Sequence, residues 1–243
     1  MSVPRARTLA SRSIPTLLVA LALSVGSLPL SAGAASLSAS STLRAALRNA
    51  KAAQWVHETV RVLRSGTVVE TSNNDIGINE GLQVTTSVGG ASSRLLAFDK
   101  SKTLYVRANA SALTLIYLMS SANAQTYTGQ WLELTPSDSI YASTSFATTL
   151  ASDFSQVRFT GPVTLGGPTT FEGKRVRTLS GVVPAMDGAP RFQGTLYVTT
   201  KGKLRPVGLR EVSAKATIEV AWSNWGHAYV LATPSGAVAY PTS

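Results

Sequence analysis

The sequence predicts an α+β protein built on one large, curved antiparallel sheet, a half-barrel, with a few helices packed on its concave face. From Trp55 onward, apolar and polar residues alternate with the period of two that is typical of strands. Turn residues such as Ser65-Gly66 and Lys201-Gly202 separate these strands at short intervals. Helical spacing replaces the alternation in three segments, near residues 42–54, 110–124 and 146–154.

The N-terminus has the three parts of a secretory signal peptide in order. Arg5, Arg7 and Arg12 precede the apolar run 17–23, and Ala32-Gly33-Ala34 satisfies the small-residue rule for cleavage. The run is shorter than the roughly 20 residues that a membrane-spanning helix needs, so an uncleaved anchor is the weaker alternative. We therefore expect a secreted or cell-envelope protein, cleaved near Ala34 or one residue later.

The expected organisation is a signal peptide at 1–34, a flexible Ser/Ala lead-in at 35–41 and a single domain at 42–243. Removing the first 34 of 243 residues leaves 209, which is compatible with one domain. Thr42 is expected to cap a helix that runs to about Gln54.

The strands expected after this helix are short and follow one another as an antiparallel meander. They lie near residues 56–64, 67–78, 81–88, 94–98, 103–107, 129–134, 156–159, 174–179, 194–199, 204–212, 217–221 and 228–231. Between them, Gly161-Pro162, Gly166-Gly167-Pro168 and Asp187-Gly188 predict turns.

Two helical segments are expected to cover the concave face. Residues 110–124 are almost continuously apolar from Leu113 to Met119, and a helix that is apolar all round must be buried. A second helix is predicted where Phe146, Leu150 and Phe154 recur at every fourth residue. The side chains that we expect to line a cavity for an acyl chain are Leu113, Ile116, Tyr117, Phe146 and Leu150. On periodicity alone, an ordinary packed core is the simpler interpretation of the same residues.

Composition restricts the function further. The absence of cysteine excludes disulfides, thiolate nucleophiles and a lipobox for acyl anchoring. The net charge of +10 includes the three signal-peptide arginines, and such a surplus favours anionic membranes or acidic polymers. Export and the lack of a recognition motif argue against a nucleic-acid partner. The densest basic groups, Lys174–Arg177 and Lys201–Arg205, are interpreted as solvated hairpin ends.

No catalytic motif is present. The sequence lacks a G-x-S-x-G elbow, H-E-x-x-H, a P-loop and a dinucleotide-binding G-x-G-x-x-G. His57 and His227 are isolated in the sequence, and so are the carboxylates. Glu133 or Asp153 could pair with another carboxylate across the fold, as a glycosidase requires, but we interpret both as solvated charges. A hydrolase is therefore the least favoured function, and no enzyme activity is predicted.

Metal and cofactor sites are not predicted either. Asn73-Asn74-Asp75 together with Asn79-Glu80 offers oxygen ligands, but lacks the ordered spacing of a calcium loop. We interpret this stretch as a polar hairpin loop.

The order of four short motifs is informative. The first motif is Tyr105-Val106, followed by the apolar segment and then by Gly129-Gln130-Trp131. The second is residues 171–176, the third is residues 196–207, and the fourth is residues 222–226, followed by a strand and Pro234. In this order the chain resembles the actinobacterial envelope lipid-carrier family, which is often lipidated and whose fold is similar to the LolA and LolB lipoprotein carriers.

The resemblance implies a curved sheet around helices with an apolar cavity, which would hold a lipid or acylated glycoconjugate and expose polar rim residues to its headgroup. Transient contact with an anionic membrane surface is the further partner that we expect. Ala32–Ala35 stands where many relatives carry the lipobox cysteine, which favours a released form. A non-enzymatic structural or interaction module of the envelope, without an open cavity, is the alternative.

Overall fold

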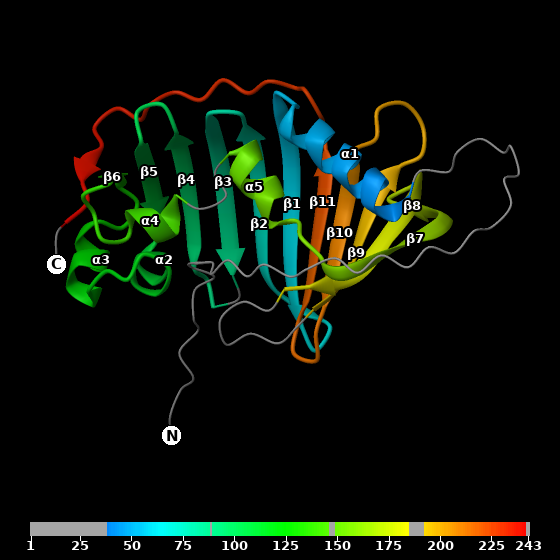
Figure 1. Cartoon of the computed structure of the whole chain (residues 1–243). Helices are drawn as coiled ribbons and strands as arrows, with labels where there is room; N and C mark the ends of the chain where they lie inside the picture. Colours follow the sequence, from blue (N-terminus) through cyan, green and yellow to red (C-terminus); the bar gives the residue numbers. More distant parts are fainter. Residues whose placement is uncertain (1–37, 88, 146–148, 185–191, 242–243) are drawn as a thin grey trace, which may run out of the picture.

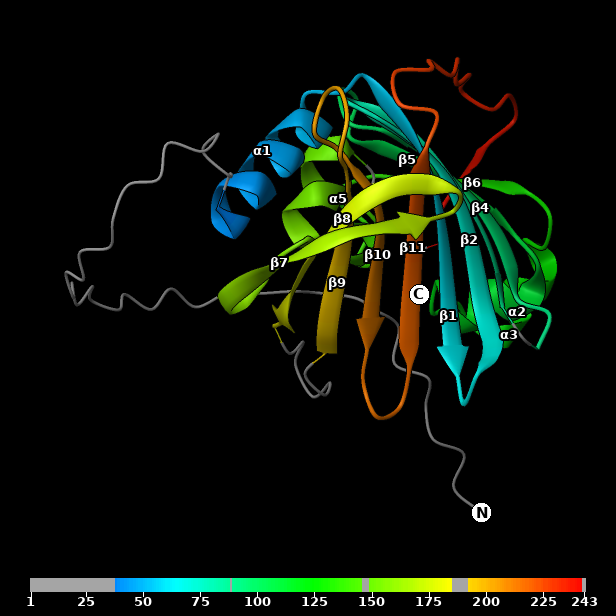
Figure 2. The same ribbon diagram turned by 90° about the vertical axis from the view of Figure 1, so that its right-hand side faces the viewer.

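A computed structural model describes residues 38–241, except for 88, 146–148 and 185–191. The predicted signal peptide, the first residues of the lead-in, Phe146 and the Asp187-Gly188 turn lie outside the described residues. Within them, all strands belong to one twisted, curved sheet, and the helices lie on one side of it (Figure 1; Figure 2). The predicted α+β class with a large antiparallel sheet is thus confirmed.

The sheet of the described chain has twelve strands in the order β12-β6-β5-β4-β3-β2-β1-β11-β10-β9-β8-β7. The first meander comprises β1 (Trp55–Arg64), β2 (Thr67–Gly77), β3 (Glu80–Ser87), β4 (Ser92–Phe98), β5 (Thr103–Ala108) and β6 (Trp131–Leu134). The second comprises β7 (Thr160–Phe171), β8 (Lys174–Val183), β9 (Phe192–Thr199), β10 (Pro206–Val212) and β11 (Thr217–Ser223). Antiparallel pairing of β1 with β11 joins the two meanders, and β12 (Val238–Ala239) adds to β6 in parallel.

Five short helices occupy the described part of the chain. They are α1 (Ala39–Lys51), α2 (Ala110–Leu115), α3 (Ser121–Thr126), α4 (Tyr141–Thr144) and α5 (Leu150–Gln156). In Figure 1, α1 lies across β1 and β8–β11, whereas α2, α3 and α4 lie at the β4–β6 end. No helix among the described residues is long and apolar enough to cross a bilayer.

Two helix predictions differ from the structure. The first helix begins at Ala39, because the Ser38 side chain already accepts a hydrogen bond from the Ser41 N–H, and Thr42 lies buried in the first turn. The apolar segment 110–124 is two helices, capped by Asn109 and Ser120, instead of one. The chain reverses between them at Leu118, whose φ of 56° is incompatible with a continuous helix.

The second meander differs at its edge. Residues 156–159 are not a strand, because α5 continues to Gln156. Gly161-Pro162 and Gly166-Gly167-Pro168 do not end strands either; they lie inside β7, which shifts register at both places. Because β7 is the last strand of the sheet, a proline lacking an N–H is tolerated on its unpaired side. The strand predicted at 228–231 is instead irregular chain that runs along the end of the sheet towards β12 (Figure 1).

Two apolar clusters form the core. One lies beneath α1 and α5 and includes Val56, Leu150, Phe154, Leu196 and Trp222. The other lies beneath α2 and α3 and includes Leu104, Val106, Leu113, Tyr117 and Leu132. The strands between the clusters, β2 and β3, contribute mainly polar side chains to the same face.

Candidate functional site

A row of buried polar side chains crosses the middle of the concave face. The register pairs Trp222 with Glu58, and Glu58 with Asn74, on the neighbouring strands β11, β1 and β2. The β2–β3 and β3–β4 registers likewise pair Ser72 with Thr85, and Thr85 with Ser93. Directly paired residues share a face of the sheet. We call the five buried members the polar row: Glu58, Ser72, Asn74, Thr85 and Ser93.

Hydrogen bonds connect most of the polar row. Asn74 Nδ2 donates to Glu58 Oε1 at 2.6 Å, and Ser72 Oγ donates to Asn74 Oδ1 at 2.8 Å. The hydroxyls of Ser72 and Thr85 are 3.1 Å apart. At the far end, Ser93 lies beside the hydroxyl of Tyr117, a buried member of the second apolar cluster. The row therefore reaches from one apolar cluster to the other.

Asp153 on α5 faces the Glu58 end of this row. Glu58 is buried, Asp153 is half-buried with its Oδ2 out of contact with water, and burial is the main cause that raises the pKa of each carboxyl group. The pKa of Asp153 lies well above its ordinary value, and the adjacent Glu58 charge and a hydrogen bond to Glu58 raise it further. Hydrogen bonds from Asn74 and Trp222 oppose the rise at Glu58, so Asp153 is the group that retains a proton.

The interpretation of Asp153 as a solvated charge is therefore wrong. Its Oδ2 is buried with no hydrogen-bond partner among the described residues, so a negative charge there would have no donor; this favours the neutral carboxyl group, which donates its proton to Glu58. Helical spacing alone placed Asp153 beside Phe154 on α5, but did not reveal which strand residue it meets. The polar hairpin interpretation of residues 73–75 is also wrong, because they lie within β2.

The predicted lining residues fall into two groups. Leu113 and Tyr117 are buried in the cluster beneath α2, and Ile116 packs against that cluster. Leu150 is buried in the other cluster, on the far side of the polar row. Phe146 lies outside the described residues.

Comparison with known proteins identifies the fold through solved structures alone. No family model matches the sequence, and no curated protein sequence matches it. LprF from Mycobacterium bovis aligns with a TM-score of 0.54 and 17% identity, over 82% of this chain and 97% of LprF. The Mycobacterium tuberculosis lipoprotein LppX aligns with a TM-score of 0.50 and 17% identity, over 78% of this chain and 95% of LppX. The chain has the LprF and LppX fold.

This LprF-like sheet also has a pocket at its rim, away from the polar row. The pocket has a volume of about 360 Å³ and lies where β1 begins, beside the β2–β3 and β4–β5 turns. Its lining combines apolar and charged side chains: Gln54, Trp55, Ile78, Asn79, Glu80, Phe98, Lys100, Ser101 and Thr233. The sequence did not predict this pocket, because its residues come from turns that are far apart in the chain.

Ser223, His57 and Asp75 lie side by side on neighbouring strands, on the opposite, convex face of the sheet. His57 Nδ1 lies 2.7 Å from Asp75 Oδ1, and Ser223 is the register partner of His57. Among the hydrogen bonds of the described residues, however, none joins Ser223 to His57. Burial and the neighbouring Asp75 charge raise the pKa of Tyr229, whose ring centroid lies 5.8 Å from that of Trp55. These contacts hold the C-terminal segment against the sheet.

Metal binding finds no support in the described chain, where no group of three or more His, Cys, Asp or Glu side chains is placed to hold an ion.

Proposed function

We propose that this protein binds a lipid or lipidated glycoconjugate between the concave face of its sheet and the overlying helices, and carries it outside the cytoplasm. The observation that supports this most is the polar row between two apolar clusters on one face. An amphiphilic ligand needs both kinds of surface within the length of one molecule.

The two apolar clusters suit acyl chains. Each buried square ångström of apolar surface contributes roughly 25 cal/mol, so a chain of ordinary length gains several kcal/mol by leaving water. Leu113, Ile116 and Tyr117 lie on or just after α2 and are the proposed contacts in one cluster. Leu150 is the proposed contact in the other.

The polar row suits the hydroxyl, ester or amide groups of the ligand. A buried pair of carboxyl groups lowers the stability of a fold that gains nothing else from it. Groups with strongly shifted pKa values are enriched at functional sites. Glu58 and Asp153, on the same face as the proposed acyl contacts, therefore favour a binding role over simple core packing.

Access to this face requires helices to move, because Leu113 and Leu150 are fully covered. The helices concerned are short: α2 and α3 have six residues each and α5 has seven. Helices of this length have little stability of their own, so their displacement costs little beyond the contacts that they lose.

Native mass spectrometry of the chain from Ala35 onward, purified after export, tests the proposal. We expect an adduct of lipid mass that organic extraction removes. Leu113→Trp and Ile116→Trp should reduce the adduct, because the added ring fills the proposed acyl site. Leu115→Trp is the matched control, since Leu115 lies on the same helix but is 57% exposed.

Two results contradict the proposal. One is a protein that stays ligand-free after incubation with host lipids. The other is equal loss of the adduct in the Leu113→Trp and Leu115→Trp variants. Either result favours a non-enzymatic envelope module that lacks an open cavity.

A further inference from the structure

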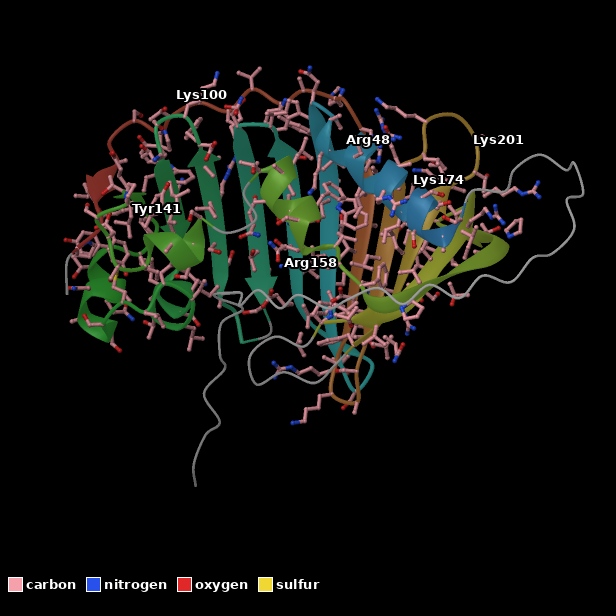
Figure 3. All side chains as sticks on the ribbon, in the orientation of Figure 1. Arg48, Lys100, Tyr141, Arg158, Lys174 and Lys201 are labelled. Carbon is pink, nitrogen blue, oxygen red and sulfur yellow. The ribbon has the colours of Figure 1, made fainter. Side chains whose placement is uncertain are left out.

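Three separate elements bring basic side chains to one corner of the molecule. They are the last turn of α1, the start of β8 and the β9–β10 turn. Figure 3 shows Arg48, Lys174 and Lys201 at this corner. We call the exposed side chains there the basic corner: Arg48, Lys51, Lys174, Arg175, Lys201 and Lys203.

Hydrogen bonds fix these elements against one another. Asn49 Nδ2 donates to the Leu204 carbonyl at 2.8 Å, which holds α1 on the β9–β10 turn. Thr200 Oγ1 donates to the Arg175 carbonyl at 3.1 Å, which joins that turn to β8. The β8–β9 register pairs Val176 with Thr199, and its continuation by two residues sets Lys174 opposite Lys201. The two basic groups that are separate in the sequence are therefore neighbours in space.

The positive charge of this corner is not neutralised within the described chain. None of the six side chains forms an ion pair with a described residue. Among the described residues, the Lys/Arg–carboxylate ion pairs are those of Arg61 and Arg210 with Glu219, on strands β1, β10 and β11. The carboxylate nearest in sequence is Glu172, in the β7–β8 turn. Like charges on neighbouring strands repel and destabilise a sheet. An external anion that relieves this repulsion gains free energy on binding.

We propose that the basic corner docks the protein onto a membrane surface through the phosphates of anionic phospholipids. The charges lie on the outside of a helix, at the start of a strand and in a turn, and all six side chains are exposed, so together they suit an extended, diffusely charged plane. Each Lys or Arg close to an anionic membrane strengthens binding about fivefold, so six produce strong attraction. This inference rests on the proposed function, because a lipid carrier must meet the membrane that supplies or receives its ligand.

The opposite end of the molecule offers a rival surface for comparison. Arg94 and Arg107 are directly paired, exposed residues of β4 and β5. This arginine pair contributes two cations, whereas the basic corner carries six. Attraction to an anionic surface therefore favours the basic corner.

Vesicle co-sedimentation of the chain from Ala35 onward tests this proposal. We expect binding to phosphatidylcholine vesicles that contain phosphatidylglycerol, and none to phosphatidylcholine alone. Binding should be lost between about 0.1 M and about 1 M salt, where the Debye length falls from about 10 to about 3 Å. Lys174→Glu/Lys201→Glu should weaken it by about tenfold or more. The matched control Arg94→Glu/Arg107→Glu changes the net charge equally and should weaken it by about threefold or less.

Several outcomes overturn the proposal: equal binding to neutral vesicles, a larger loss in the Arg94/Arg107 variant, or binding to soluble polyphosphate without binding to vesicles. The last outcome identifies an acidic polymer as the partner. Thermal melting of both double variants shows whether each is folded.

Native mass spectrometry separates this proposal from the proposed function. Lys174→Glu/Lys201→Glu should keep its lipid adduct, and Leu113→Trp should keep its affinity for vesicles. If the wild type has no lipid adduct but binds anionic vesicles through the basic corner, only the proposed function is contradicted. If it has a lipid adduct but does not bind anionic vesicles, only the docking proposal is contradicted.

Discussion

The carboxyl groups of Asp153 of α5 and Glu58 of β1 meet beneath the helix, 95 positions apart in the sequence. Trp222 Nε1 donates to Glu58 Oε2 at 2.9 Å and completes the environment of the pair. The pair therefore links a helix to the seam where β1 and β11 join the two meanders.

Asp153→Asn should stabilise the protein at neutral pH. An amide in this position donates to Glu58 without holding a titratable proton, which removes the cost of burying a second charge. We expect a gain of about 1 kcal/mol or more in the free energy of unfolding near pH 7. Urea denaturation measures it, and unchanged or lower stability in Asp153→Asn contradicts the shared proton.

The same pair should make stability depend on pH. Because the pKa of Asp153 is raised in the folded state, the unfolded chain releases this proton first as the pH rises. The stabilising contribution is complete below the ordinary Asp pKa and is lost as the pH rises through the folded-state value. Denaturation midpoints between about pH 4 and about pH 8 should fall with pH in the wild type, and fall less in Asp153→Asn. Parallel curves for the two proteins exclude this assignment.

Trp222→Phe and Trp225→Phe should have different effects on stability. Both rings pack on Phe154, with centroids 5.1 and 5.6 Å away. Trp222 Nε1 donates to the buried Glu58, whereas Trp225 Nε1 is buried without a partner. Loss of the Trp222 donor should cost about 1 to 3 kcal/mol. Trp225→Phe removes an unsatisfied N–H group and should lower the free energy of unfolding clearly less. Chemical denaturation measures both variants, and equal losses of stability rule out a stabilising role for the hydrogen bond to Glu58.

The sequence predicts strands well where neighbours in the chain are also neighbours in the sheet. The alternation from Trp55 to Arg107 corresponds to β1–β5, which pair in sequence order. The β1–β11 pairing joins residues such as Glu58 and Trp222, and no local pattern specifies it. At β7, local turn chemistry predicted breaks at Pro162 and Pro168, but an edge strand absorbs both.

The candidate site is predictable only in its apolar part. A run such as Leu113 to Met119 signals burial by itself, wherever it packs. Glu58 and Asn74 occupy ordinary alternate positions in strands, and the same pattern describes a solvated face. Their burial depends on which helices cover the sheet, and that depends on contacts between residues far apart in the chain.

Leu118 and Leu115 should respond oppositely to replacement by glycine. Leu118 has a φ of 56° and is 72% exposed, so its side chain strains the backbone and packs little. Leu118→Gly should stabilise the protein by up to about 1 kcal/mol, because glycine adopts positive φ without penalty. Leu115→Gly falls at the end of α2 and should destabilise by about 0.5 to 1 kcal/mol. Thermal melting compares the two, and destabilisation in both variants contradicts the strained turn between α2 and α3.

Gly208→Ala should destabilise the second meander. A Cβ at Gly208 on β10 would collide with the ring of Phe171, which is stacked on Tyr197 at a centroid distance of 4.4 Å. The ring cannot withdraw without breaking this stack, so we expect a cost of about 1 to 3 kcal/mol. Gly167→Ala is the control, since a Cβ there meets no atom within 4 Å and the φ of Gly167 is not positive. A Gly208→Ala variant as stable as Gly167→Ala in urea would mean that Phe171 does not pack on β10.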